Sequence, residues 1–96
     1  MTLGLYLVHC GYYDSEAGGG VFESHVDLFV VGSDFTDARE RAKALPEFRA
    51  RSMHVDGMLR IEIVKGHSIT VEPPKGAKTR LVVYRKRGHA PLVTEK

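Results

Sequence analysis

Two stretches in which polar and apolar residues alternate constrain the fold of this chain more than any other feature. Glu23, His25 and Asp27 occupy every second position of the first stretch, and His54 and Asp56 do the same in the second. Because successive side chains of a β-strand point to opposite faces, each set shares one face. We expect the two strands to be adjacent, with His25 and His54 on the same face, so that these ionisable groups converge on one side of a sheet. Unpaired charge is costly to bury, so the pattern predicts either a functional site or a hydrogen-bonded network.

The rest of the chain reads as strands around a single helix. The helix begins after Ser33 or Asp34, either of which can cap it. Its regular pattern closes at Pro46, which can also open one further turn. Its apolar stripe contains alanines at positions 38 and 42, so the helix must pack closely on its neighbour. The predicted strands span residues 3–10, 21–31, 52–65, 67–72 and 80–85.

This order, β-β-α-β-β-β with short links, predicts an α+β two-layer sandwich. One helix covers one face of an antiparallel sheet of four or five strands. We expect strand 21–31 at the centre of the sheet and a bulge at Gly57. The apolar side of strand 52–65 is expected to hold Met53, Val55, Leu59, Ile61 and Ile63, and its polar side His54, Asp56, Arg60 and Glu62.

A single helix leaves the far face of the sheet uncovered. We expect this face to carry the polar residues described above together with Tyr6, Val8, Phe29, Val31 and Tyr84. Contiguous apolar patches are uncommon on monomers, and two-fold association is the commonest way to cover them. The sequence therefore predicts a homodimer built on the sheet.

The size of the chain allows one hydrophobic core. Its 96 residues are too few for two independent domains, and we predict a single α+β domain over residues 1–87 and a flexible tail over 88–96. The one cysteine, Cys10, excludes an internal disulfide framework, suits a reducing compartment and is expected to be a small buried residue. The N-terminal apolar run is too short for a signal core or a membrane span, so we expect a cytoplasmic protein.

Charge is distributed unevenly along the chain. Residues 75–96 hold seven basic residues against Glu95, a balance of +6, whereas residues 1–74 hold seven basic and eleven acidic residues, a balance of −4. We interpret the basic end as an edge strand that lysine and arginine protect from aggregation, with contact to phosphate or an acidic partner as the alternative. Nucleic-acid binding is not expected, because the chain has neither an RNA-binding aromatic signature nor zinc-finger spacing.

Two interpretations of the polar residues remain open. In a metal site, His25, His54 and Asp56 would ligate one ion and leave an open position for water, which would allow hydrolytic chemistry. In a structural network, the two histidines would be held across the strands by Glu23, Asp27 and Asp56. We favour the network, because ligand spacing without a characteristic helix or loop context is weak support for a metal.

The same motifs also point to a family. They are Cys10-Gly11, then Glu23-x-His25-x-Asp27 followed by Phe29-Val30-Val31, and then His54-x-Asp56-Gly57 leading to Lys65-Gly66-His67. Over residues 3–72 the chain resembles a family of small bacterial proteins known only as a domain of unknown function. It differs by a glycine-rich expansion before Glu23, and by Val26 where family members more often place an acid directly after the histidine. The resemblance implies a shared fold and strand arrangement, and no assigned activity.

Together these observations predict a small, self-associating, non-enzymatic binding or interaction module. Its candidate ligand-binding residues are Glu23, His25, Asp27, His54 and Asp56. The alternative is a protein that binds a metal ion or a small molecule through the same histidines and carboxylates. The sequence identifies no cofactor and no catalytic residue, and it leaves open whether the protein is an enzyme.

Overall fold

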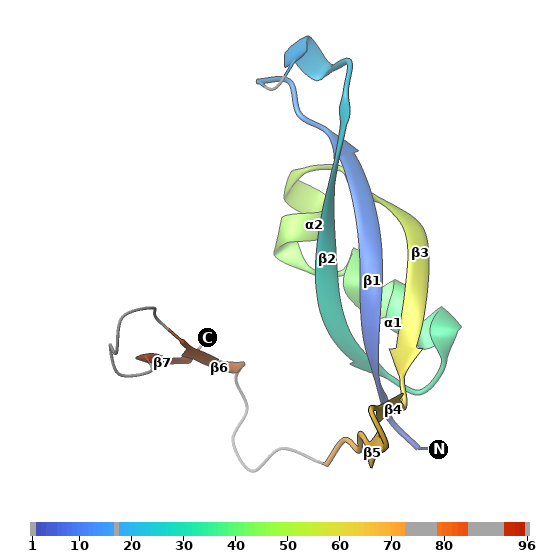
Figure 1. Cartoon of the computed structure of the whole chain (residues 1–96). Coiled ribbons are helices and arrows are strands. Elements are labelled where there is room, and N and C mark those ends of the chain that lie inside the picture. The colour runs from blue at the N-terminus through green and yellow to red at the C-terminus, as the bar shows by residue number, and fades with distance from the viewer. Residues whose placement is uncertain (1, 17, 73–78, 85–91, 96) are drawn as a thin grey trace.

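The protein folds as a three-stranded antiparallel sheet with two helices on one face (Figure 1). The computed structural model describes residues 2–16, 18–72, 79–84 and 92–95. The sheet has the order β2-β1-β3, with β1 (Gly4–Tyr13), β2 (Glu23–Gly32) and β3 (His54–Ile61). The helices are α1 (Phe35–Lys43) and α2 (Pro46–Ala50), and the face that they leave uncovered is called the open face below. The remaining elements are η1 (Gly18–Gly20), β4 (Ile63–Val64), β5 (His67–Ser68), β6 (Arg80–Val83) and β7 (Leu92–Glu95).

The predicted α+β class and antiparallel sheet are confirmed, but two details of the prediction are wrong. Within the described ranges the sheet has three strands instead of four or five, and two helices instead of one connect β2 to β3. The backbone reverses at Lys65 and Gly66, whose φ angles are 47° and 80°, so β5 pairs with β4 and does not extend the sheet. Pro46 opens α2 as its first residue, a position that proline favours.

Of the two residues that the sequence offers as caps of helix α1, Ser33 and Asp34, the structure uses Asp34. The Asp34 side chain accepts a hydrogen bond from the Asp37 amide at 2.7 Å, and the Asp37 carboxylate accepts one from the Ser33 amide at 2.8 Å. The bond from Ser33, and then the one from Arg41, hold the pKa of Asp37 below its usual value. These bonds set the point at which the chain leaves β2 and turns over the sheet.

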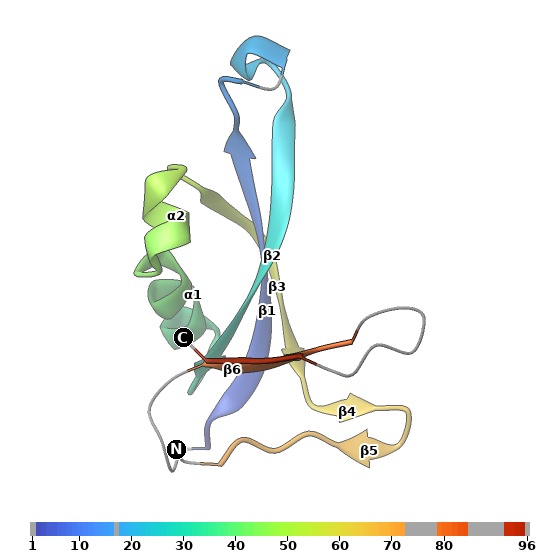
Figure 2. The ribbon, with the colours of Figure 1, turned by 90° about the vertical axis from the view of Figure 1, so that its left-hand side faces the viewer.

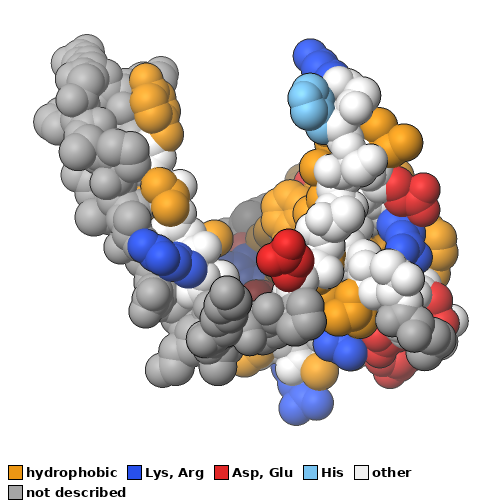
Figure 3. Space-filling model, turned by 90° about the horizontal axis from the view of Figure 1, so that it is seen from below, with side chains coloured by type: hydrophobic (Ala, Val, Ile, Leu, Met, Phe, Trp, Pro, Cys, Tyr) orange, Lys and Arg blue, Asp and Glu red, His pale blue; other side chains and the backbone are white. Residues whose placement is uncertain are grey.

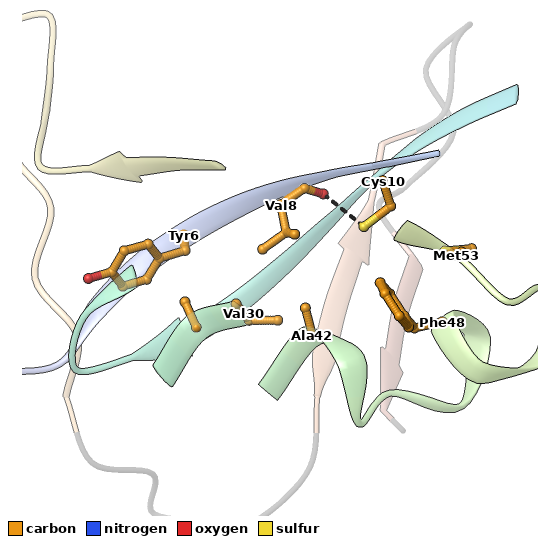
Figure 4. Close-up of a cluster of buried hydrophobic side chains, with 8 residues drawn as sticks. Tyr6, Val8, Cys10, Val30, Ala42, Phe48 and Met53 are labelled. Carbon is orange, nitrogen blue, oxygen red and sulfur yellow. Dashed lines mark hydrogen bonds between the residues drawn. The ribbon is translucent and has the colours of Figure 1, made fainter. Parts of the chain in front are cut away.

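The hydrophobic core lies between the helices and the middle of the sheet (Figure 4). Its largest fully buried side chains are Tyr6, Val8 and Cys10, all from β1. They pack with the other buried residues, which are Val30, Ala38, Ala42, Phe48 and Met53. The prediction that Cys10 is a small buried residue is confirmed, and burial, followed by the charges of two nearby carboxylates, raises the pKa of its thiol.

Two predictions about the sheet are wrong. The central strand is β1 and not β2, and the helices cover the face of β1 that carries Tyr6 and Val8. The register pairs Tyr6 with Val30, and both side chains face the helices. Tyr6 and Val8 are therefore buried in the core instead of lying on the uncovered face. Phe29 and Val31 do lie on the open face, where 63% of Phe29 is exposed.

Strand β3 contains a bulge at Asp56, next to Gly57, where the sequence predicts one. His9 of β1 pairs with Gly57, and the next residue of β1 pairs with Val55, so Asp56 has no partner on β1. The bulge shifts the alternation by one residue. Val55 packs against the core, whereas Leu59 is 61% exposed on the open face. The predicted common apolar side of this strand is therefore wrong.

The β4–β5 hairpin projects on the side of the sheet away from the helices (Figure 2), whereas the strands of the β6–β7 hairpin lie apart from the sheet, beyond its β2 edge (Figure 1). β6 is the predicted fifth strand, but it pairs with β7 and not with the sheet. β7 falls within the segment predicted as a flexible tail, while residues 85–91 and 96 lie outside the described residues. The domain boundary stays a prediction. No helix in the described part of the chain has the length and hydrophobicity needed to cross a lipid bilayer.

Candidate functional site

Four of the predicted site residues meet on the open face, toward the end of the sheet where β1 finishes. Glu23 and His25 come from β2, and His54 and Asp56 come from β3. Gly11 of β1 pairs with His25 on one side and with His54 on the other, so both imidazoles start from the same row of the sheet. We call Glu23, His25, His54 and Asp56 the histidine–carboxylate cluster.

Both carboxylates of the cluster lie between the two imidazoles. The Nε2 atom of His25 lies 2.7 Å from Glu23 Oε1 and 3.1 Å from Asp56 Oδ2. The Nε2 atom of His54 lies 3.2 Å from Glu23 Oε1 and 3.1 Å from Asp56 Oδ1. The Tyr13 hydroxyl donates a hydrogen bond of 3.2 Å to Glu23 Oε2. All four side chains are partly exposed, so solutes can reach them from the open face.

Gly11 makes this convergence possible. A Cβ atom at this position would contact Glu23 Oε1, and it would lie 2.6 Å from His54 Nε2 and 2.7 Å from Asp56 Oδ2, closer than real Cβ atoms approach. The prediction that His25 and His54 share a face is confirmed, but the prediction that their strands are adjacent is wrong. The side chains meet across the central strand because that strand has no side chain in this row.

The groups of the cluster act together on the Glu23 carboxylate. Its pKa is held below the usual value, first by the hydrogen bond with Asp56, then by the bonds with His54 and Tyr13 and by the charge of His25, which together outweigh desolvation. The contact with Glu23 in turn raises the pKa of Tyr13. A lowered carboxyl pKa keeps Glu23 ionised at neutral pH. The cluster therefore offers an anionic oxygen beside two imidazole nitrogens.

Asp27, the fifth residue of the predicted site, lies outside the cluster. Its Oδ1 atom lies 2.6 Å from the Nδ1 atom of His9. The ring of His9 stacks on the ring of His25, with centroids 4.8 Å apart and 3° between the planes. His9 is a neighbour of the site that sequence reasoning missed. A signal was available, because His9 continues the alternation of Leu5 and Leu7 along β1.

Three cluster residues can direct one ligand atom each to a common point. These atoms of Glu23, His25 and Asp56 all lie within 4.8 Å of one another. The set shares His25 and Asp56 with the metal ligands predicted from the sequence, and Glu23 takes the place of His54. Imidazole nitrogens and carboxylate oxygens are common ligands of divalent transition metals. The arrangement can thus hold a cation, or it can form a hydrogen-bonded network by itself.

A depression of about 500 Å³ adjoins the cluster on the open face. It is lined by Leu7, His9, Asp27, Gly57, Met58 and Leu59. The pair of Asp27 and His9 therefore separates the cluster from the apolar residues further along the sheet.

Comparison of the chain with models of protein families, with curated proteins and with solved structures finds no match. The resemblance to a small bacterial family therefore stays a prediction.

Proposed function

We propose that the protein is a small binding module whose ligand is a divalent transition-metal ion. Glu23, His25 and Asp56 would hold the ion on the open face, with His54 beside them. The observation that supports this proposal is the missing side chain at Gly11, which leaves room on the central strand for ligating groups from both flanking strands. We therefore prefer the metal site over the structural network that the sequence favours.

The spacing of the ligating atoms is close to that of a metal site. The four nitrogen–oxygen separations in the cluster are 2.7, 3.1, 3.2 and 3.1 Å. In a tetrahedral zinc site with bonds of about 2.0–2.1 Å, neighbouring ligand atoms are about 3.3 Å apart. A small outward movement of partly exposed side chains would convert one arrangement into the other.

The chemistry of the ligands narrows the choice of metal. Calcium and magnesium prefer shells made of oxygen atoms, whereas mixed imidazole and carboxylate ligands suit zinc, iron(II) and manganese(II). The partial exposure of the cluster differs from closed structural zinc sites and leaves a coordination position open to solvent. We propose binding alone and assign no reaction to the site.

Calorimetric titration of the full chain with zinc tests this proposal. The His25→Ala variant should lose affinity by more than about 100-fold, because loss of a ligand costs more than the 10–100-fold seen for outer-shell partners. His67→Ala is the matched control, since His67 lies on β5 and bonds the Lys65 carbonyl group outside the cluster. Its affinity for zinc should equal that of the wild type. Equal binding by wild type and His25→Ala would refute the proposed site.

Metal binding should also stabilise the fold. At a zinc concentration 100 times Kd, the free energy of unfolding should rise by about 2.7 kcal/mol. For a chain of this size the unfolding temperature should then increase by roughly 10 °C or more, and a chelator should reverse the increase. If zinc neither binds nor shifts the unfolding temperature, the cluster is a structural network.

We further propose that the protein self-associates and works in the cytoplasm. Self-association is supported by the exposed apolar residues of the open face, among them Phe29 and Leu59. The single free cysteine, Cys10, suits a reducing compartment.

A further inference from the structure

Tyr13, the last residue of β1, lies beside the histidine–carboxylate cluster and contacts two of its members. It pairs with Glu23 across β1 and β2, and its hydroxyl donates a hydrogen bond of 3.2 Å to Glu23 Oε2. Its ring lies near the ring of His54, with centroids 6.2 Å apart and 36° between the planes. Tyr13 is therefore placed to act on the site through Glu23.

The two oxygen atoms of the Glu23 carboxylate have different neighbours. Oε1 lies 2.7 Å from the Nε2 atom of His25 and 3.2 Å from the Nε2 atom of His54. Oε2 is the oxygen that accepts the hydrogen bond from Tyr13. A carboxylate can bind a metal ion through one oxygen or through both. While Tyr13 bonds Oε2, only Oε1 is directed toward the imidazoles and toward an ion between them.

The number of oxygens that Glu23 supplies affects which metal the site prefers. Zinc in proteins is usually tetrahedral, whereas manganese(II) favours octahedral shells rich in oxygen. Glu23, His25 and Asp56 with one ligand atom each, together with a position open to solvent, complete a tetrahedron. A second oxygen from Glu23 would enlarge the shell and suit manganese(II) better. The hydrogen bond from Tyr13 therefore favours zinc.

Tyr13 is suited to orienting its neighbour and contributes little to the core. Its side chain is 58% exposed, so loss of its hydroxyl opens no buried cavity. The hydrogen bond with Glu23, and then the charge of Glu23, raise the pKa of Tyr13. The hydroxyl consequently keeps its proton at neutral pH and remains a hydrogen-bond donor to the carboxylate.

The described residues offer a metal ion one such group of ligands. Among them, Glu23, His25 and Asp56 are the only three histidine, cysteine or acidic residues whose ligand atoms converge. Figure 3 shows the opposite end of the sheet, where the histidine visible in that view is separated from the acidic side chains. Selectivity between metals therefore has to be set at the cluster and by the residues that touch it.

We infer that Tyr13 is a positioning residue that holds Glu23 as a ligand through one oxygen and thereby sets a preference for zinc over manganese(II). The inference rests on the proposed metal binding and adds to it the residue that determines selectivity.

Calorimetric titration of the full chain with zinc and with manganese(II) tests this role. Tyr13→Phe keeps the ring and removes the hydroxyl. Its affinity for zinc should fall by about 10–100-fold, as for other outer-shell partners, whereas its affinity for manganese(II) should be retained. The ratio of the two dissociation constants should therefore change by at least about tenfold.

Cobalt(II) provides a spectroscopic readout of the same change. Tetrahedral cobalt(II) absorbs visible light more strongly than cobalt(II) in a larger shell, so the visible bands should weaken in Tyr13→Phe. Tyr12→Phe is the matched control, because it removes the same hydroxyl from the neighbouring residue, whose ring packs against the core under the Arg51 guanidinium group. Tyr12→Phe should equal the wild type in both metal affinities and in the cobalt spectrum.

The possible failures can be told apart. If the wild type binds neither metal, the proposed function fails and the inference falls with it. If the wild type binds zinc and Tyr13→Phe shows the same two affinities and the same cobalt spectrum, only the role of Tyr13 is refuted. An equal loss of affinity for both metals would also overturn the inference, because Tyr13 would then support the site without selecting the metal. Circular dichroism checks that each variant folds.

Discussion

Replacing Gly11 with alanine should remove the metal site while the fold stays intact. Ordinary contact at a Cβ atom begins at 3.4 Å, so the His54 and Asp56 atoms at 2.6 and 2.7 Å must retreat by roughly 0.8 and 0.7 Å. Metal–ligand distances tolerate deviations of only about 0.2 Å. We therefore expect zinc affinity to fall by at least about 100-fold, which corresponds to ~2.8 kcal/mol of binding free energy.

The same substitution should change stability little. Gly11 lies in regular strand without a positive φ, so alanine fits its backbone. Where the backbone is compatible, replacing glycine by alanine stabilises a protein by about 0.4–1 kcal/mol through the unfolded chain. This gain opposes the loss of hydrogen bonds in the partly exposed cluster. Urea unfolding should therefore give a midpoint close to that of the wild type.

Gly57→Ala is the matched control for this experiment. Gly57 lies beside Asp56 in the bulge of β3, yet a Cβ atom there would meet nothing within 4 Å. Calorimetric titration with zinc should give wild-type affinity for Gly57→Ala and a strongly reduced affinity for Gly11→Ala. If Gly11→Ala binds zinc as tightly as Gly57→Ala, the space above the central strand does not form the site.

Four further predictions follow from particular residues. Asp27→Ala should keep its zinc affinity within about threefold of wild type in the same titration, because Asp27 lies outside the cluster; a larger loss would place it among the ligands. Asp34→Ala removes the cap of α1 and should lower the free energy of urea unfolding by about 1 kcal/mol, and no change would show that the cap is dispensable. Folding lowers the pKa values of Glu23 and Asp37 from their ordinary values of 4.5 and 3.8. The stability that these two carboxylates contribute is therefore complete above those ordinary values, and it is lost as the pH falls through the lowered pKa values of the folded state. The urea concentration at the unfolding midpoint should therefore decrease as the pH is lowered from about 5 to about 3, and a midpoint that stays constant over this range would contradict the prediction. A chain ending at Tyr84 should still unfold cooperatively by circular dichroism, since the removed strand pairs with β6 and not with the sheet; loss of the transition would show that the removed segment docks on the body.

The sequence by itself determined the local features of this protein. Alternation along single strands placed Glu23 and His25 on one face, because the two-residue period of a strand depends only on its own backbone. Capping chemistry limited the start of α1 to Ser33 or Asp34, since a helix end is satisfied by residues within one turn. Gly57, which interrupts the alternation of β3, likewise indicated a bulge at this point of the strand. Strand faces and the helix cap need no partner from elsewhere in the chain.

Only the tertiary structure decided which segments meet. Strand order depends on pairing between distant residues, and it placed β1 between the two polar strands, burying Tyr6 and leaving Gly11 beneath the cluster. The bulge at Asp56 then moved Leu59 to the open face, because one unpaired residue reverses every later side chain of a strand. The alternation specifies the faces of each strand, whereas long-range register specifies which of those faces form a site.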